Sequence, residues 1–233
     1  MLGKIDVFFN TASRLEYLIP TVNSFLNNMK YSMGFRLILH DDVIKKEGSA
    51  KVSKWVEESK LFDLFIKTEP AKRLGCAIYK ELKIAESPFI INWEDDWILL
   101  KEVFLDEILE AMVKNPKINE VTFNHDGNDS SKHGVHRPML DCGTFRLTQI
   151  QEWAIGPSVW RTEFVRSKWP DHADAHHCLR VFGSINPGRE RGMEWMANNV
   201  GCYFMGGYGE GLYVKHIGVN SVWNSPIDGM GVG

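Results

Sequence analysis

PFIINWEDDW, at residues 88–97, is an apolar run that ends in three consecutive carboxylates, Glu94, Asp95 and Asp96. An apolar run of this length, opened by a proline, is typical of a buried strand, so the three acids are expected at its C-terminal edge. Adjacent carboxylates repel one another near a protein core unless a positive charge is supplied. Their hard oxygen atoms suit Mg²⁺ or Mn²⁺, which take further ligands from phosphates and water. A divalent-metal site is therefore one interpretation, and a solvated acidic turn is the other.

The residues before this run alternate between short apolar strands and amphipathic helices. Ser13 is expected to cap the first helix, and Pro20 to delay or kink its start. The β-α-β order predicts an α/β fold with a mostly parallel, doubly wound, Rossmann-like sheet and helices on both faces. The predicted strands are residues 4–9, 35–39 and 61–66, and the predicted helices are residues 14–28, 50–59 and 75–86.

Polar residues follow three of the predicted strands. Residues 10–14 come after the first strand, Asp41 and Asp42 after the second, and the acids at 94–96 after the apolar run. In open α/β sheets, ligands bind outside the carboxyl ends of the strands. Because those ends meet at one edge of the sheet, we expect these polar side chains to converge on one site.

The second half of the chain is less regular. Its most polar segment, residues 125–141, is rich in glycine, histidine and acidic residues, and a loop of this length is more often functional than idle. No linker or charge block separates the halves, so we expect one domain over residues 1–233. The predicted helices are residues 102–114, 162–168, 173–181 and 193–200, and the predicted strands are residues 121–124, 144–150, 202–205 and 212–215.

Composition and charge argue against several classes of protein. The 233 residues carry a formal net charge of −3, so no broad basic field indicates a nucleic-acid partner. The sequence shows no signal peptide and no run of roughly 20 apolar residues for a transmembrane segment. Four scattered cysteines contain no CxxC pair, which indicates neither a zinc ribbon nor a disulfide framework. We expect a soluble, cytoplasmic protein with reduced thiols, and its oligomeric state is left open.

Three segments in this order resemble motifs of nucleotide-sugar-dependent glycosyltransferases with the GT-A fold, of the family-2-like kind. They are VFFNTASRLEYL (residues 7–18), LILHDD (37–42) and RLGCAIYKELKIAESPFIINWEDDW (73–97). Gly75 matches the family glycine, and Glu94 with Asp96 occupies the Asp-X-Asp site. Two departures are the Ser87–Pro88 pair, where the family usually has glycine and an acid, and Glu94 in place of the first aspartate. The likeness covers the first hundred residues well and the remainder in patches.

The resemblance implies a donor site for a nucleoside-diphosphate sugar. Asp41 and Asp42 match the acids that contact the nucleotide base and ribose, and basic residues near the predicted third helix match phosphate contacts. Each also has an ordinary alternative, because aspartates favour turns and caps, and basic side chains line solvated helix faces. The residues expected to bind the nucleoside-diphosphate sugar donor are Thr11, Arg14, Asp41, Asp42, Arg73, Lys80, Glu94 and Asp95.

A divalent cation, Mn²⁺ or Mg²⁺, is the cofactor that the resemblance implies, because it clamps the departing diphosphate electrostatically. Its expected ligands are Asp96, Glu94 and His216. His216 stands in a predicted strand that ends His-Ile-Gly, where GT-A enzymes often place a histidine that completes the metal shell. A lone histidine is also often structural, and both interpretations of His216 stay open.

Inverting transfer also needs a general base that takes the proton of the acceptor hydroxyl, usually a carboxylate at the start of a helix. Glu190 and Glu194 lie one helical turn apart in the segment RERGMEW, residues 189–195. Glu194 is favoured because its apolar neighbours can raise its pKa, whereas Glu190 is flanked by arginines. Asp171 and Asp174 are the next candidates.

Two further groups of side chains leave their roles open. His172 and His176 have the i,i+4 spacing of two ligands on one helix face, but no HExxH motif accompanies them. Several tryptophans are either sugar-stacking platforms or core residues. These are Trp153, Trp160, Trp169, Trp195 and Trp223.

The function expected from these observations is metal-dependent, inverting transfer of a sugar from a nucleoside-diphosphate sugar to a carbohydrate or other hydroxyl-bearing acceptor. Residues 1–100 are expected to bind the donor, and residues 101–233 the acceptor. A sugar nucleotidyltransferase is one alternative, but it would want a glycine-rich basic loop that residues 10–13 do not supply. A metal-dependent hydrolase and a non-catalytic nucleotide- or carbohydrate-binding domain are the others.

Overall fold

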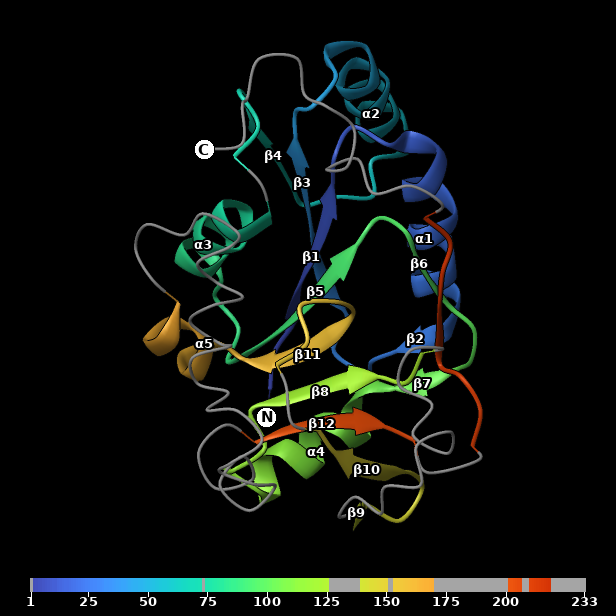
Figure 1. The fold of residues 1–233 in the computed structure, drawn as a ribbon, viewed down its shortest axis with the longest axis vertical. Coiled ribbons are helices and arrows are strands. Elements are labelled where there is room, and N and C mark those ends of the chain that lie inside the picture. Colours follow the sequence, from blue (N-terminus) through green and yellow to red (C-terminus); the bar gives the residue numbers. More distant parts are fainter. Residues whose placement is uncertain are drawn as a thin grey trace, which may run out of the picture.

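The computed structural model describes residues 2–72, 74–125, 139–150, 153–169, 201–206 and 210–218. A nine-stranded sheet forms the centre of this part of the chain (Figure 1). Its strands are β1 (Ile5–Thr11), β3 (Phe35–Asp42), β4 (Leu64–Thr68), β5 (Phe89–Glu94), β8 (Glu120–Phe123), β9 (Met139–Asp141), β10 (Arg146–Gln149), β11 (Ser158–Arg161) and β12 (Cys202–Met205).

The strands follow the order β4-β3-β1-β5-β11-β8-β12-β10-β9 across the sheet. β4, β3, β1 and β5 are parallel to one another, and β12 is parallel to β8. β11 is antiparallel to β5 and β8, and β10 is antiparallel to β12 and β9. The predicted α/β fold with a mostly parallel central sheet is confirmed.

Helices cover both faces of this sheet. Because successive strand residues point to opposite faces, Val7 and Phe9 pack with α1, α2 and α4, whereas Phe8 packs with α3 and α5. In Figure 1, α3 and α5 lie to the left of the sheet, and α1 and α2 lie to the right. None of the helices that the structure describes has the length and apolar character that a membrane crossing needs. They are α1 (Leu15–Asn28), α2 (Lys46–Ser59), α3 (Leu74–Ile84), α4 (Leu105–Lys114) and α5 (Thr162–Lys168).

The chain changes direction across the sheet at β1. From β1 it passes through α1 to β3 on one side, and it later returns to form β5 on the other side. In open α/β sheets, the crevice at such a point is where ligands bind. Two small sheets complete the fold: β6 (Trp97–Leu99) pairs with β13 (Val214–His216), and β2 (Met29–Lys30) pairs with β7 (Val103–Phe104).

The predicted helix cap at Ser13 is wrong. α1 begins at Leu15, and the residue at its N-cap position, Arg14, makes no side-chain cap. Ser13 has a φ of 62°, and its N–H and hydroxyl both donate to Asp41 Oδ1, at 2.9 and 3.1 Å. A bond to a distant strand therefore takes the place of a local cap. Pro20 lies inside α1, which continues through it without a break.

Several other boundaries differ from the prediction by a few residues. β3 continues to Asp42 because its last residues still pair with β4. α2 begins at Lys46, before the predicted residue 50, and α4 begins at Leu105 because the two residues before it pair with β2 as β7. β9 lies in the segment predicted as a polar loop. Residues 126–138, and the predicted helices at 173–181 and 193–200, lie outside the described residues.

Glu120, the first residue of β8, is a carboxyl group with no exposed surface. Both of its oxygens accept the Ala154 N–H, at 3.1 and 3.2 Å, and Trp160 Nε1 donates to Oε1 at 3.1 Å. Burial raises the pKa of Glu120 to about 8, although these hydrogen bonds lower it. The carboxyl group is therefore mostly protonated in the folded protein at neutral pH.

The free energy of unfolding should consequently fall as the pH rises through the range between the unfolded and folded pKa values of Glu120. In that range the folded chain keeps a proton that the unfolded chain has lost, which costs up to about 1.4 kcal/mol per pH unit. In Glu120→Gln, the free energy of unfolding measured by urea denaturation should fall less steeply with pH between about pH 5 and about pH 8 than in wild type. Glu102→Gln, at an exposed side chain, is the control and should keep the wild-type profile. An equal slope in Glu120→Gln and wild type would contradict the assignment.

Candidate active site at the strand ends

The loop between β1 and α1 is bonded to the end of β5. Thr11 Oγ1 donates to Asp95 Oδ2 at 2.6 Å and accepts the Arg14 N–H at 3.2 Å. Asn10 Nδ2 donates to Asn92 Oδ1 at 3.0 Å, and the Asn10 carbonyl accepts the Asp95 N–H at 2.9 Å. These bonds hold the loop and the acidic turn together as one unit.

Asp95 lies at the centre of this unit and has no exposed surface. Arg14 Nε donates to its Oδ2 at 3.1 Å, and Arg14 Nη2 donates to its Oδ1. Burial raises the pKa of Asp95 to about 6, although Arg14 and Thr11 lower it. Burial also lowers the pKa of Arg14, but the neighbouring carboxylates outweigh it and the net change is a rise. The Asp95 carboxylate faces Arg14 and Thr11, so its direct role is to position the Arg14 guanidinium.

Asp96 points to the other side of the turn, toward His216. Its Oδ2 lies 3.0 Å from Arg14 Nη2 and 3.3 Å from His216 Nε2. The Ile217 N–H donates to the Asp96 carbonyl at 2.8 Å, so the segment after β13 closes over the acid. A Cβ on Gly218 would lie 2.5 Å from Asp96 Oδ2, which is closer than any side chain allows. The two predicted metal ligands Asp96 and His216 are thus brought together.

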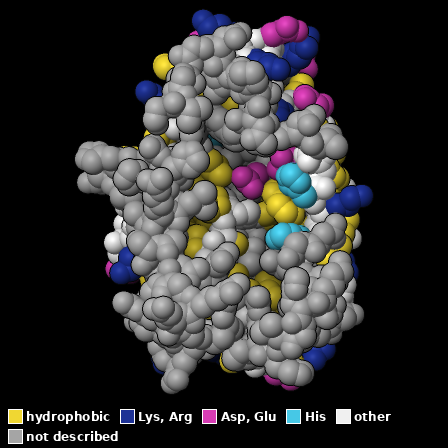
Figure 2. Space-filling view, viewed as in Figure 1, with side chains coloured by type: hydrophobic (Ala, Val, Ile, Leu, Met, Phe, Trp, Pro, Cys, Tyr) yellow, Lys and Arg dark blue, Asp and Glu magenta, His cyan; other side chains and the backbone are white. Residues whose placement is uncertain are grey.

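Glu94 is oriented toward Trp97. Trp97 Nε1 donates to Glu94 Oε2 at 3.1 Å, and burial, helped by the charge of Asp96, raises the pKa of Glu94 to about 7. The Trp97 ring also packs against two histidines, with ring centroids 5.0 Å from His125 and 4.8 Å from His216. Figure 2 shows histidine and acidic side chains side by side in a hollow on this face of the molecule.

Asp41, at the end of β3, is fully buried beside the same loop. Its Oδ1 is held by Ser13, but its Oδ2 has no hydrogen-bond partner among the residues that the structure describes. Asn10 Oδ1, on the neighbouring strand, is also buried without a partner in the described part of the chain. Asp42 Oδ1 accepts the Lys72 N–H at 2.8 Å. Two buried acceptor atoms at adjacent strand ends thus have no donor from the residues that the structure describes.

Lys80, predicted to contact phosphate, is bonded to the end of β4 instead of reaching the acids. Its Nζ donates to Thr68 Oγ1 at 2.7 Å, and Thr68 also contacts His40 Nε2 at 2.8 Å. His40 Nδ1 in turn lies 3.1 Å from Glu81 Oε1, so a polar chain runs from the helix surface into the core. The predicted residues that lie outside the described part of the chain are Arg73, Asp171, His172, Asp174, His176, Glu190, Glu194, Trp195 and Trp223.

Three of the tryptophans considered as sugar platforms are core residues. Trp153, Trp160 and Trp169 are buried in the cluster that α3 and α5 cover. Trp97, which follows the three acids, has its ring beside His125 and His216 at the site. The Asn10–Asn92 pair was also missed, although an asparagine in the middle of an apolar strand is a visible signal of a specific polar contact.

Solved structures with a similar fold come from several glycosyltransferases. S. aureus TarS 1–349, in complex with UDP-GlcNAc, has a TM-score of 0.60 at 14% identity over 98% of this chain and 62% of that one. GalNAc-T7 with UDP, GalNAc and Mn²⁺ has a TM-score of 0.56 at 11% identity, covering 93% and 44%. The mannosyltransferase PcManGT from Pyrobaculum calidifontis, with GDP-Man and Mn²⁺, has a TM-score of 0.52 at 9% identity, covering 72% and 47%.

The chain has the GT-A fold. No protein-family model matches the sequence, and no curated protein matches it significantly. The chain spans less than two thirds of the length of each of the three structures above. At identities this low the likeness shows the fold alone, so the activity has to be argued from the site.

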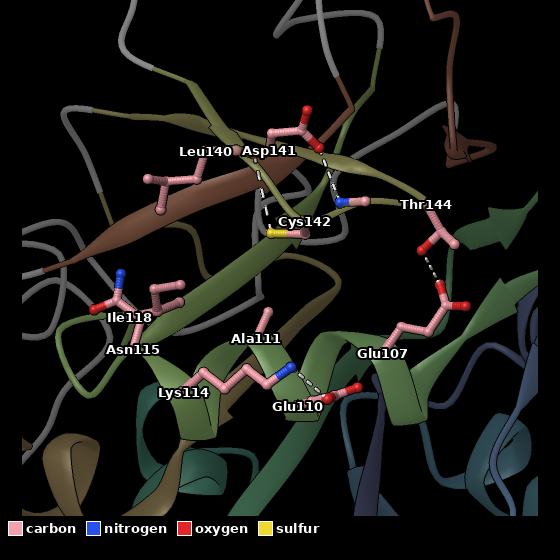
Figure 3. A pocket seen from close by; sticks show the side chains of 11 residues that line it. Glu107, Glu110, Ala111, Lys114, Asn115, Ile118, Leu140, Asp141, Cys142 and Thr144 are labelled. Atoms are coloured by element: carbon pink, nitrogen blue, oxygen red, sulfur yellow. Dashed lines mark hydrogen bonds and ion pairs between the residues drawn. The ribbon is translucent and has the colours of Figure 1, made fainter.

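A cavity of about 520 Å³ lies elsewhere on this GT-A fold, between α4 and the turn that joins β9 to β10 (Figure 3). Its charged side chains already have partners: Thr144 Oγ1 donates to Glu107 Oε2 at 2.6 Å, and Lys114 pairs with Glu110. Asp141 Oδ1 accepts the N–H of Gly143. The cavity lies at the opposite edge of the sheet from β3 and β4, and we assign it no part in the chemistry of the strand ends.

Gly48, in the first turn of α2, lets that helix approach the loop that carries Arg14. A Cβ at this position would lie 2.3 Å from the Ser13 carbonyl oxygen, so Gly48→Ala has to push the two backbones apart. We expect a loss of about 1–3 kcal/mol in the free energy of unfolding, measured by urea denaturation. Gly3→Ala, where no atom lies within 4 Å of the added carbon, is the matched control. Equal stabilities for the two variants would show that the contact at Gly48 does not constrain the loop.

Proposed function

We propose that the protein is a glycosyltransferase that moves a sugar from a nucleoside-diphosphate sugar to an acceptor hydroxyl. The observation that carries the proposal is a pair of buried acceptors at the strand ends of the crevice, Asp41 Oδ2 and Asn10 Oδ1, which have no hydrogen-bond partner among the described residues. Buried acceptors in folded proteins almost always have a donor. The N–H groups of a nucleotide base and the hydroxyls of its ribose are donors of the required kind.

The donor half of the site is residues 1–100. In this proposal Asp41 accepts from the base, Asp42 lies beside the ribose, and Thr11 and Arg14 fix the loop under the diphosphate. Arg73 and Lys80 remain candidates for phosphate contacts, and contact by Lys80 requires its bond to Thr68 to open. The GT-A neighbours whose titles include UDP-GlcNAc, UDP or GDP-Man support a nucleotide-sugar donor.

A divalent cation fits the donor set beside Asp96. Asp96 Oδ2 already lies beside Arg14 Nη2 and His216 Nε2, and the His216 imidazole is half exposed. No three His, Cys, Asp or Glu side chains form a ready metal cage among the described residues. Mg²⁺ and Mn²⁺ commonly take few protein ligands and complete their shell with phosphate and water. Asp96 and His216 would hold the ion, with Glu94 nearby, and the ion would stabilise charge on the departing diphosphate.

The acceptor half is residues 101–233. Glu194, or Glu190 one turn earlier, would take the proton of the acceptor hydroxyl as it attacks the sugar, which makes the transfer inverting. Trp97 offers an indole ring at the site, and aromatic faces pack well against sugars. The proposal needs no nucleic-acid partner, and a cytoplasmic location stays a prediction from the sequence.

Asp41→Asn should weaken nucleoside-diphosphate binding. Asparagine keeps an oxygen for Ser13 but replaces the unpartnered acceptor with an N–H group, so a hydrogen bond to a charged group is lost. Such bonds are worth about 1.5–3 kcal/mol, which predicts a roughly 10- to 100-fold rise in the dissociation constant. The measurement is calorimetry with UDP and GDP, with and without Mn²⁺.

Asp63→Asn is the matched control for this change. Asp63 Oδ2 also accepts a backbone N–H, from Leu37 at 2.8 Å, but near the start of β3, away from the strand ends. This variant should bind nucleotide as the wild type does. Wild-type protein that binds no nucleoside diphosphate would make the proposal wrong. Binding without transfer to any acceptor in a broad screen would favour a non-catalytic binding domain.

Glu194→Gln should separate binding from chemistry. Glutamine keeps the shape of the side chain but cannot take a proton, so sugar transfer should fall by roughly 10²–10⁴-fold. Donor affinity, measured by calorimetry, should change little because the base faces the acceptor hydroxyl. Glu190→Gln is the companion variant: loss of transfer there, with wild-type activity in Glu194→Gln, would move the base one helical turn. Full activity in both variants would exclude this segment.

A further inference from the structure

Arg14 is the cation that neutralises the acidic turn. Its side chain is largely buried, and its guanidinium contacts two of the three consecutive acids at once. Nε and Nη2 hold Asp95 as a fork, and Nη2 is shared with Asp96 at 3.0 Å. The guanidinium therefore stands beside the same carboxylate that a divalent cation would use.

The two acids hold this guanidinium differently. Asp95 has no exposed surface, and its Oδ2 also accepts the Thr11 hydroxyl, so its bonds are internal to the fold. Asp96 contacts Arg14 through Oδ2 alone, and the same oxygen also lies 3.3 Å from His216 Nε2. The Asp95 contacts can thus persist while the Asp96 contact opens.

A metal ion and the Arg14 contact are incompatible at Asp96 for an electrostatic reason. A cation at Oδ2 would have to replace Nη2 directly. A cation at Oδ1, the other oxygen of the same carboxylate, would still lie within a few ångström of the guanidinium. Like charges at such a separation repel strongly where the surroundings exclude water. One positive charge on Arg14 and two on the metal ion would then share one carboxylate.

We propose that Arg14 is the resident counter-cation of this site and that a divalent cation displaces Nη2 from Asp96 when it binds. The Asp95 fork keeps the guanidinium at the site after the displacement. Arg14 thereby sets the metal affinity by competition, and it holds the acidic turn in shape when no metal is bound. The metal belongs to the proposed function, so the inference rests on that proposal.

The test is Mn²⁺ binding to the nucleotide-free protein, followed by the electron paramagnetic resonance signal of free Mn²⁺. Arg14→Met removes the competing charge while keeping an unbranched side chain. Its Mn²⁺ dissociation constant should fall at least roughly tenfold below that of wild type, given the size of charge interactions at this separation. Arg36→Met is the matched control, because Arg36 pairs with Asp6 and Glu86 away from the acidic turn, and its Mn²⁺ affinity should equal that of wild type.

Arg14→Met also leaves the Asp95 carboxylate buried without its cation, which can prevent folding. A second pair of variants avoids this problem, because Asp95→Asn removes the buried charge. In Asp95→Asn alone, Arg14 faces a neutral amide at position 95, and Asp96 is the one carboxylate of the pair left to it, so Mn²⁺ should bind more weakly than to wild type. The double variant Arg14→Met/Asp95→Asn should bind Mn²⁺ at least roughly tenfold more tightly than Asp95→Asn.

Equal or weaker Mn²⁺ binding in Arg14→Met, or in the double variant relative to Asp95→Asn, would overturn the inference. Absence of Mn²⁺ binding in every variant would overturn it as well. These outcomes are separate from the failure of the proposed function, which is read by nucleotide binding and sugar transfer. If the protein transfers no sugar but the Arg14→Met variant binds Mn²⁺ more tightly than wild type, the competition between Arg14 and the metal holds and the proposed glycosyltransferase activity is wrong.

Discussion

A buried carboxylate, that of Asp95, is the group on which the geometry of the site depends. A charge without exposed surface is tolerated only with a partner and with hydrogen bonds to its remaining lone pairs. Arg14 and Thr11 supply these from the loop after β1, and the Thr21 hydroxyl donates to the Asp95 carbonyl at 2.7 Å from within α1. One residue directly after β5 thereby fixes the neighbouring strand end through its side chain and the helix that follows through its carbonyl.

This requirement propagates outward along the loop. Arg14 can reach Asp95 only if the chain turns sharply before it, and Ser13 makes that turn in the left-handed region. Ser13 is held there by Asp41 Oδ1, and the other oxygen of Asp41 has no donor in the part of the chain that the structure describes. The absence of a side chain at Gly48 then allows α2 to pack against the same turn. The unpartnered acceptor that indicates a ligand is thus a consequence of how the acidic turn is neutralised.

The sheet could be predicted from the sequence because it depends on short-range patterns. Alternation, apolar runs and turn residues locate strands and helices within a few residues, and the carboxyl ends of parallel strands must share one edge. The convergence of residues 10–14, 41–42 and 94–96 followed from that rule alone. Side-chain pairing could not be predicted in the same way, because it is set by contacts between distant segments. Ser13 has the composition of a helix cap, and only the position of β3 directs it elsewhere.

The three consecutive acids show the limit most clearly. Their chemistry is the same in sequence, but the turn points Asp95 inward to Arg14, Asp96 toward His216 and Glu94 toward Trp97. Trp97 differs from Trp160 for a related reason: one follows the acids on a small flanking sheet, and the other lies in the middle of a central strand.

One guanidinium cannot fully balance three neighbouring carboxylates: after burial, the charge of Asp96 is the next largest cause that raises the pKa of Glu94 to about 7. The folded protein keeps this unfavourable arrangement, and such arrangements are typical of functional sites. A bound cation together with an anionic diphosphate would add positive charge beside the acids and then cover it with negative charge. In the proposed function, a site with excess negative charge and one displaceable arginine would therefore favour the two ligands together over either one alone.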